Sequence, residues 1–179
     1  LLLLPVTQAA VELLNYLATS ILPPVALPKL DFDDGVPEDC TTLIAVPTLL
    51  INSKQIRQLV EDLEVRYLGN QDPHIHYALL TDLPDSSEPA DERDSRIELA
   101  QQCIADLNKR YKHLGQGQFF LFHRHRIYNP QEKTWMGWER KRGKLLDLNK
   151  LLRGVFDPFP VKSGDLSILP SVRYVITLD

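Results

Sequence analysis

Cysteine is scarce in this sequence of 179 residues, which contains only Cys40 and Cys103. Small secreted scaffolds held together by disulfides need a denser set of cysteines, so that class is excluded. Cys103 falls in the apolar stripe of a predicted helix. We therefore expect two reduced thiols in the core of a protein that is exposed to the cytosol.

Charge is almost absent from residues 1–22, where Glu12 is the single charged side chain. The chain opens on "LLLLPV", without an initiator methionine or a basic region, so we expect a segment of a longer polypeptide rather than a signal peptide. Polar residues recur at helical spacing opposite an apolar face, which predicts an amphipathic helix. The polar residues are Gln8, Glu12, Asn15 and Thr19, and the apolar ones are Leu13, Leu14, Leu17 and Ile21.

Three environments are open for this helix: packing on the rest of the domain, lying in a membrane interface, or spanning the membrane. The proline-rich stretch "ILPPVALPKLDF" ends it and favours extended chain. We thus expect residues 1–28 to form a helix and linker, and residues 29–179 to form the N-terminal part of one domain.

Two phosphate-binding fingerprints are missing. No GxGxxG follows the first predicted strand, and GxxxxGK[ST] occurs nowhere, which argues against dinucleotide and P-loop sites. A formal charge of −4 and a pI near 5.7 argue against general nucleic-acid binding.

Positive charge is nevertheless concentrated between Arg124 and Arg153, where nine Lys or Arg residues accompany three acids. This segment carries +6, so the remainder carries −10. A cluster of this size fits one phosphorylated small molecule; a solvated basic face is the alternative. Trp135 and Trp138 within it could stack on a sugar or base, or belong to the core.

From Thr41 onward, short apolar runs alternate with amphipathic helical patterns in the order βαβαβαβ. The strands begin near Thr42, His76, Phe119 and Arg173, and the helices cover about 52–70, 94–115 and 144–152. This order predicts a three-layer α/β domain with a mainly parallel sheet. Residues 155–170, with prolines at 158, 160 and 170, are expected to form a loop.

Ligands of parallel sheets bind at the carboxyl ends of the strands. The residues there are Pro47, Thr48, Thr81, Asp82, His123 to Arg126, and Asp179. Two pairs of histidines, His74 with His76 and His123 with His125, could each point to one face of a strand. Because no cysteine or acid with suitable spacing accompanies them, we do not expect a zinc site.

Several stretches resemble the glycosyltransferase region of cyclic β-1,2-glucan synthases. They are "LPKLDF", "LIAVPTLL", "HYALLTDLPDS", "WMGWERKRGKLLDLNKLLRG" and the terminal "RYVITLD". The resemblance implies a GT-A type nucleotide-sugar domain, related to Rossmann-like folds, in which Asp179 is the first Asp of an Asp-x-Asp metal motif for Mg²⁺ or Mn²⁺. It implies no catalytic residue within these 179 residues, and turnover would need the second metal carboxylate and a general base from elsewhere.

Roles for named residues follow from this resemblance together with the strand ends. Asp82, with Asp85 in reserve, would accept a hydrogen bond from the uracil of UDP-glucose, and Pro47 and Thr48 would line the base. The basic residues Arg140, Lys141, Arg142 and Lys144 would bind the diphosphate, helped by the amino end of a helix. Gly143 would let the backbone approach the phosphates.

For the complete protein, the resemblance implies an inverting glucosyltransferase of the bacterial inner membrane, with this domain facing the cytoplasm. Its partners would be UDP-glucose, the growing glucan and the membrane, which residues 1–22 could also touch, but not nucleic acid. A nucleotidyltransferase-like domain and a non-catalytic interaction domain remain alternatives.

Overall fold

The computed structural model describes residues 3–22, 32, 34–89, 94–114 and 118–178. Residues 1–33 and 34–179 form two separate compact units, and the predicted boundary near residue 28 lies outside the described residues. The first unit contains one helix, α1 (Leu3–Ile21). Within the described ranges, no helix combines the length and apolar character needed to cross a bilayer.

The second unit contains one five-stranded sheet, one two-stranded hairpin and three α-helices among its described residues. The strands are β1 (Thr42–Leu49), β2 (Ile75–Asp82), β3 (Phe119–His123), β4 (Ile127–Asn129), β5 (Thr134–Met136), β6 (Val161–Ser163) and β7 (Tyr174–Thr177). The helices are α2 (Ser53–Gly69), α3 (Ser95–Tyr111) and α4 (Arg140–Leu152), with short 3-10 turns η1 (Glu38–Cys40), η2 (Lys112–Leu114) and η3 (Leu166–Ser171).

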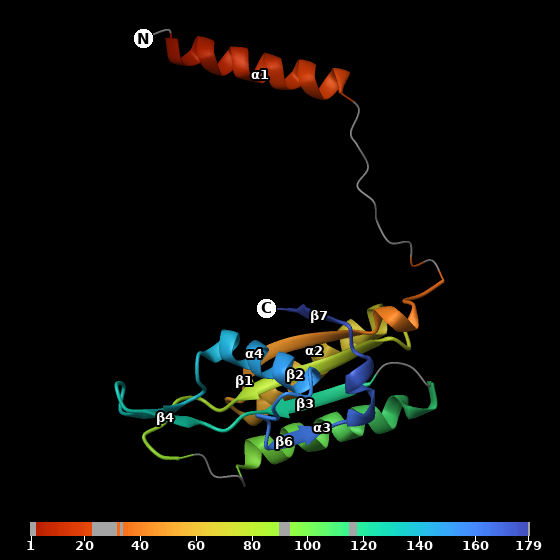
Figure 1. Ribbon diagram of the computed structural model, residues 1–179, viewed down its shortest axis with the longest axis vertical. Helices are drawn as coiled ribbons and strands as arrows, with labels where there is room; N and C mark the ends of the chain where they lie inside the picture. The colour runs from red at the N-terminus through yellow and green to blue at the C-terminus, as the bar shows by residue number, and fades with distance from the viewer. Residues whose placement is uncertain (1–2, 23–31, 33, 90–93, 115–117, 179) are drawn as a thin grey trace. The chain divides into compact units, whose positions relative to one another are not determined.

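The large sheet has the strand order β6-β3-β2-β1-β7 (Figure 1). All neighbouring strands run parallel except β6, which pairs antiparallel with β3. The predicted three-layer α/β fold with a mainly parallel sheet is therefore confirmed.

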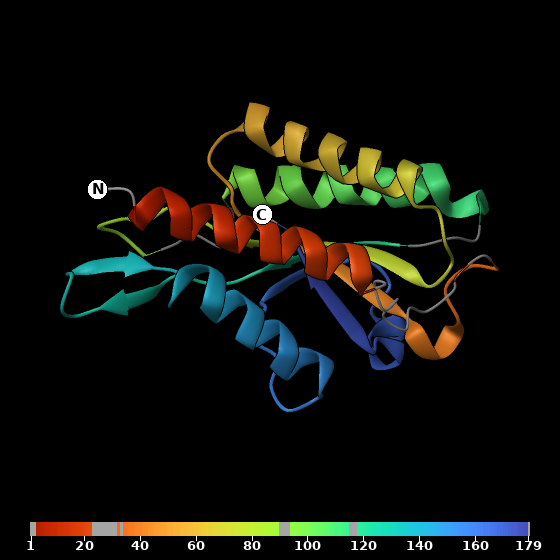
Figure 2. The same cartoon turned by 90° about the horizontal axis from the view of Figure 1, so that it is seen from above.

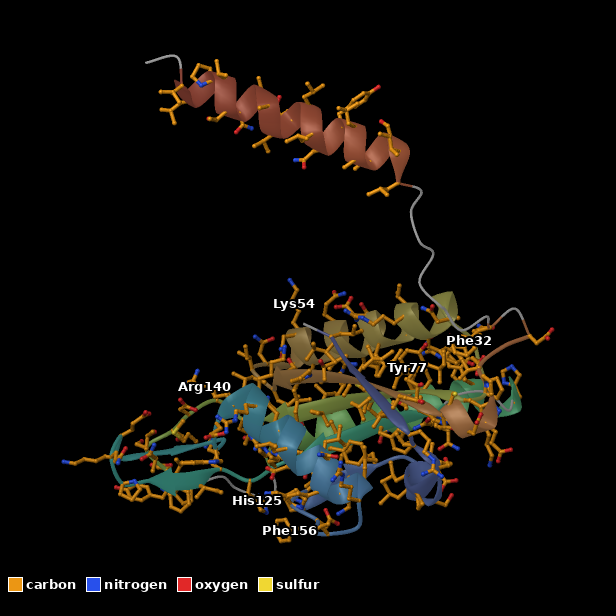
Figure 3. The ribbon with its side chains drawn as sticks, turned by 45° about the horizontal axis from the view of Figure 1, so that its top comes forward. Phe32, Lys54, Tyr77, His125, Arg140 and Phe156 are labelled. Carbon is orange, nitrogen blue, oxygen red and sulfur yellow. The ribbon has the colours of Figure 1, made fainter. Side chains whose placement is uncertain are left out.

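Helices cover both faces of the sheet. Figure 2 shows α2 and α3 together on one side and α4 on the other. Because successive strand residues point to opposite faces, Tyr77 and Leu79 join the core under α2 and α3, whereas Ala78 and Leu80 join the core under α4. Tyr77, labelled in Figure 3, is completely buried in the first of these cores.

Local sequence explains where the two covering helices begin. The side chain of Asn52 accepts a hydrogen bond from the Gln55 amide at the start of α2, and Asp94 accepts one from the Arg96 amide at the start of α3. Both are capping interactions that satisfy backbone donors at a helix terminus. Asn52 and Asp94 are thus the N-caps of α2 and α3.

Two predictions about local structure were wrong, and one hairpin was not predicted. Residues 155–170 do not form only a loop, because β6 extends the sheet there and Phe159 is buried against Phe122. The basic segment contains an additional hairpin, β4–β5. Helix α4 begins at Arg140, one turn before the predicted Lys144, so the basic cluster forms its first turn.

Both cysteines are free and half-buried. Cys103 packs against the core under α2 and α3, as its place in the apolar stripe predicted.

Candidate functional site

The carboxyl ends of β1, β2 and β3 meet at one rim of the sheet. Leu49 is paired with Asp82 across β1 and β2, and Thr81 is paired with His123 across β2 and β3. This register places Arg124, the residue after β3, level with Asp82. The predicted convergence of these strand ends is confirmed for the described residues.

A hollow of about 190 Å³ opens at this rim. Its lining residues are Pro47, Thr48, Leu49, Asp82, Leu83, Asp85, Gly137, Arg140, Lys141 and Lys144. It therefore gathers all the predicted nucleotide-sugar residues except Arg142. Three cations and two carboxylates line it, so cations are in excess.

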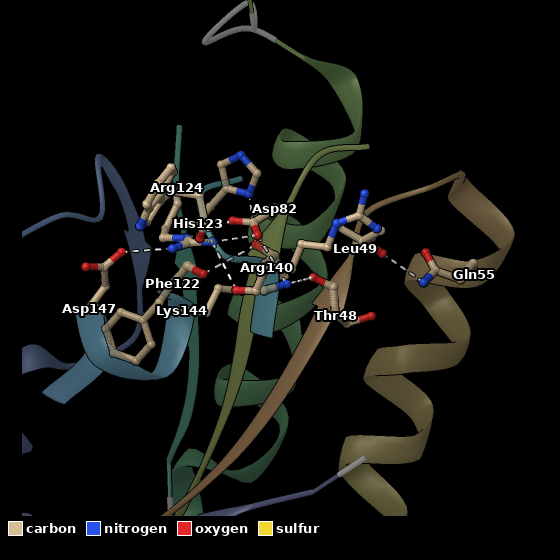
Figure 4. A network of polar contacts seen from close by, with 12 residues as sticks. Thr48, Leu49, Gln55, Asp82, Phe122, His123, Arg124, Arg140, Lys144 and Asp147 are labelled. Carbon is tan, nitrogen blue, oxygen red and sulfur yellow. Dashed lines mark hydrogen bonds and ion pairs between the residues drawn. The ribbon is translucent and has the colours of Figure 1, made fainter. Parts of the chain in front are cut away.

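Asp82 forms the centre of a buried ionic network (Figure 4). Its Oδ1 accepts from Arg124 Nε and its Oδ2 from Arg124 Nη2, both at 2.9 Å. Asp82 and Arg124 are 2% and 4% exposed, so water does not screen this pair. Burial alone would lower the pKa of Arg124, but its hydrogen bonds and the charges of Asp82 and Asp147 raise it.

The same arginine reaches two further elements. Arg124 Nη1 donates to Asp147 Oδ2 on α4 at 2.9 Å. Its Nη2 also donates to the carbonyls of Trp138 and Arg140, at 3.2 and 3.3 Å. One side chain thus holds Asp82, the turn before α4 and the body of α4 in a fixed arrangement.

Lys144 is the second cation at Asp82. Its Nζ donates to the Thr48 carbonyl at 2.5 Å and lies 3.3 Å from Asp82 Oδ2. Its side chain is almost completely buried, and this burial lowers the pKa of Lys144. Lys144 therefore joins β1 and β2 at the floor of the hollow, and its predicted contact with a diphosphate would have to be made in addition.

His123 lies behind the network. Its Nδ1 is 2.9 Å from the Thr81 hydroxyl, and both side chains are buried. Burial is the main reason that the pKa of His123 is lowered to about 4. The imidazole is therefore neutral at pH 7.

Two glycines make room for Arg124. A Cβ on Gly137 would lie 2.5 Å from Asp82 Oδ2, and one on Gly143 would collide with the Trp138 carbonyl and lie 2.9 Å from Arg124 Nη1. The sequence predicted that Gly143 would let the backbone approach the phosphates of a ligand. In the structure, the groups that approach it are Trp138 and Arg124.

The amino end of α4 concentrates positive charge. Arg140 and Lys141 occupy its first turn beside the hollow, and no acid is present in that turn. The amino end of a helix carries a partial positive charge, so cations there create a potential that an anion would relieve. Arg140 donates to Asp85 at 2.9 Å, and Figure 3 places Arg140 at the start of α4.

Arg142 points elsewhere. Its Nε lies 3.2 Å from Glu139, and its side chain is 78% exposed. It lines a second, shallow depression with Leu145, Leu146 and Lys141, of which Lys141 also lines the hollow. The two tryptophans are not core residues either. Trp135 is half-buried against Tyr128, and Trp138 is 56% exposed.

Among the residues that the structure describes, no group of three or more His, Cys, Asp or Glu side chains is placed to hold a metal ion. The predicted metal ligand, Asp179, lies outside the described residues.

Three residues of the site were not predicted from the sequence: Arg124 as a partner of Asp82, Gly137 and Asp147. Arg124 lies at the end of a predicted strand, so its place at the same rim as Asp82 was expected, but only the register of β2 and β3 brings the two side chains together. Nothing in the local pattern distinguished Asp147 from an ordinary exposed acid on a helix.

The chain is 44% identical over 177 residues to the cyclic beta-(1,2)-glucan synthase NdvB of Rhizobium meliloti (strain 1021). The match covers 98% of this chain but spans only 6% of that protein. No family model matches the chain. The resemblance to cyclic β-1,2-glucan synthases is thus confirmed, for one segment of such a protein.

Proposed function

We propose that this chain is the donor-binding part of a glycosyltransferase that uses UDP-glucose to build β-1,2-glucan. One observation carries the proposal: a single hollow has a buried carboxylate at its floor and a basic helix terminus at its edge. A uridine diphosphate presents a matching pair of groups, an imide N–H donor on the base and an anionic diphosphate. The similarity to a glucan synthase supports the sugar class.

The hollow is smaller than pockets that enclose a complete ligand, which are commonly about 300–1,000 Å³. A volume of about 190 Å³ suits one part of a nucleotide sugar. In the proposed pose, Asp82 contacts the base, Pro47 and Thr48 flank it, and Arg140 and Lys141 contact the diphosphate. Lys144 mainly holds Asp82, and Arg142 has no direct contact.

The proposed reaction is a single displacement at the anomeric carbon, which inverts an α-linked donor into a β-linked product. This chain would bind and orient the donor, and its cations would stabilise the charge that develops on the departing UDP. A divalent cation at Asp179 belongs to the proposal for the complete protein, as do the general base, the glucan acceptor and an inner-membrane location facing the cytoplasm.

Calorimetric titration of the chain with UDP, uridine and inorganic pyrophosphate tests the proposal. UDP should bind more tightly than either part, because it engages both the carboxylate and the basic terminus. If UDP does not bind at millimolar concentration, the donor-binding assignment is wrong and a non-catalytic interaction domain replaces it. A strong preference for UTP over UDP would instead favour a nucleotidyltransferase-like domain.

A further inference from the structure

We propose that Arg124 is a positioning residue that sets the base selectivity of the hollow by fixing the Asp82 carboxylate. The inference rests on the proposed function, because it concerns which nucleoside diphosphate the same site accepts. Arg124 does not line the hollow itself. It would act only through the side chain that it holds.

Most of the acceptor capacity of Asp82 is already used inside the protein. An ionised carboxylate has about four positions for accepting hydrogen bonds. Arg124 Nε occupies one on Oδ1, whereas Arg124 Nη2 and Lys144 Nζ occupy the two on Oδ2. The contacts described for Asp82 therefore leave one acceptor position, on Oδ1.

One acceptor position distinguishes between bases by their hydrogen-bonding edges. Uracil presents a single imide N–H between two carbonyl oxygens, which one acceptor satisfies. Guanine presents two neighbouring N–H groups, and these are best satisfied by both oxygens of an unoccupied carboxylate. Cytosine presents a ring-nitrogen acceptor at the same place, which a carboxylate repels. The arrangement therefore favours uracil.

The surroundings show that this orientation is enforced. Arg124 is anchored on its far side by Asp147 and by the carbonyls of Trp138 and Arg140. Gly137 has no room for a Cβ beside Asp82. The carboxylate thus cannot rotate without breaking several charge-assisted bonds, which are about twice as strong as neutral ones.

Arg124→Lys provides the test, because lysine keeps the buried positive charge but cannot form the two-point contact. UDP affinity should fall about tenfold, the equivalent of one charge-assisted hydrogen bond. GDP affinity should stay the same or rise, so the preference for UDP over GDP shrinks. A loss of packing alone would weaken both ligands equally and leave their ratio unchanged.

Arg96→Lys is the matched control. Arg96 forms the same two-point contact with Asp94 outside the hollow, so its replacement should leave the ratio at the parent value. If Arg124→Lys folds and keeps the parent ratio, Arg124 does not position Asp82. If the parent protein binds no UDP, the proposed function itself is wrong. This result is distinguishable from an unchanged UDP-to-GDP ratio in Arg124→Lys, which contradicts only the role of Arg124.

A second measurement uses the parent protein and stays decisive if Arg124→Lys does not fold. The Nε–H of Arg124 should give a separate, slowly exchanging NMR signal, because it is buried and bonded to a carboxylate. Saturation with uridine should shift this signal, since the base shares Oδ1 with it. Uridine binding that leaves the signal unmoved would overturn the inference.

Discussion

Lys144 Nζ lies 3.3 Å from Asp82 Oδ2, and both side chains are almost completely buried. Arg124 contacts the same carboxylate and also pairs with the half-buried Asp147, so Asp82 is the fully buried carboxylate that the two buried cations share. Asp82 is therefore as much a structural residue as a candidate ligand-binding one. This changes what its replacement should do.

Asp82→Ala should destabilise the protein by about 3–5 kcal/mol, because it leaves Arg124 and Lys144 buried without their shared partner. From the sequence, Asp82 was assigned only a hydrogen bond to the base. Urea denaturation followed by circular dichroism measures the loss. Asp85→Ala is the control: Asp85 and Arg140 are exposed, so about 0–1 kcal/mol is expected. Equal effects of the two changes would contradict the buried network.

Arg140→Gln combined with Lys141→Gln should weaken UDP binding by about 1.5–3 kcal/mol and leave uridine binding nearly unchanged, because only the diphosphate end is altered. Arg142→Gln removes the same charge from the same helical turn, but Arg142 lies outside the hollow. UDP binding should therefore be retained in this control variant. Calorimetry at two salt concentrations adds a check, since screening should reduce the contribution of the exposed Arg140. If Arg142→Gln causes the larger loss, the diphosphate contact has been assigned to the wrong side of α4.

Gly137→Ala should destabilise the protein by about 1–3 kcal/mol, the usual range for forcing extra atoms into a packed site. Its Cβ would lie 2.5 Å from Asp82 Oδ2, so UDP binding should weaken as well. Gly69→Ala adds the same methyl group at the end of α2, where nothing lies within 4 Å. That control should be neutral or slightly stabilising, because alanine favours helix. Thermal melts of both variants measure the difference.

Stability should fall as the pH is lowered from about 6.5 to about 4, because burial lowers the pKa of both His76 and His123 to about 4. In the unfolded chain each has its ordinary pKa of 6.5, so in this window the unfolded state binds more protons. Each histidine contributes up to about 3 kcal/mol above the window, and this contribution is lost within it.

Replacement of one histidine isolates its share of this pH dependence. The backbone amide of Gln118 donates to His76 Nδ1, so His76→Gln can keep an acceptor without a titrating group. Urea midpoints at pH 7, 5.5 and 4.5 should then vary less than in the parent. An unchanged pH profile would show that His76 does not titrate with unfolding.

The architecture could be predicted from local pattern. Apolar runs such as "HYALLTD" alternate with helical stretches bounded by Asn52 and Asp94, and parallel strands linked by helices bring their carboxyl ends to one rim. For this reason Asp82 and Thr48 could be placed together from sequence alone. Likewise, the distribution of charge along the chain was enough to locate the basic segment.

Tertiary contacts decided the rest. Whether Arg140 or Arg142 faces the hollow depends on where α4 begins, and α4 begins at Arg140, directly after a turn in which the Arg140 amide donates to the Gly137 carbonyl. The strand β6 forms because it can pair with β3 at the edge of the sheet, although the proline-rich sequence favours a loop there. Arg124 forms hydrogen bonds with Asp82 and Asp147, which lie 42 and 23 residues away along the chain. Such pairings depend on distance in space, which spacing along the chain does not determine.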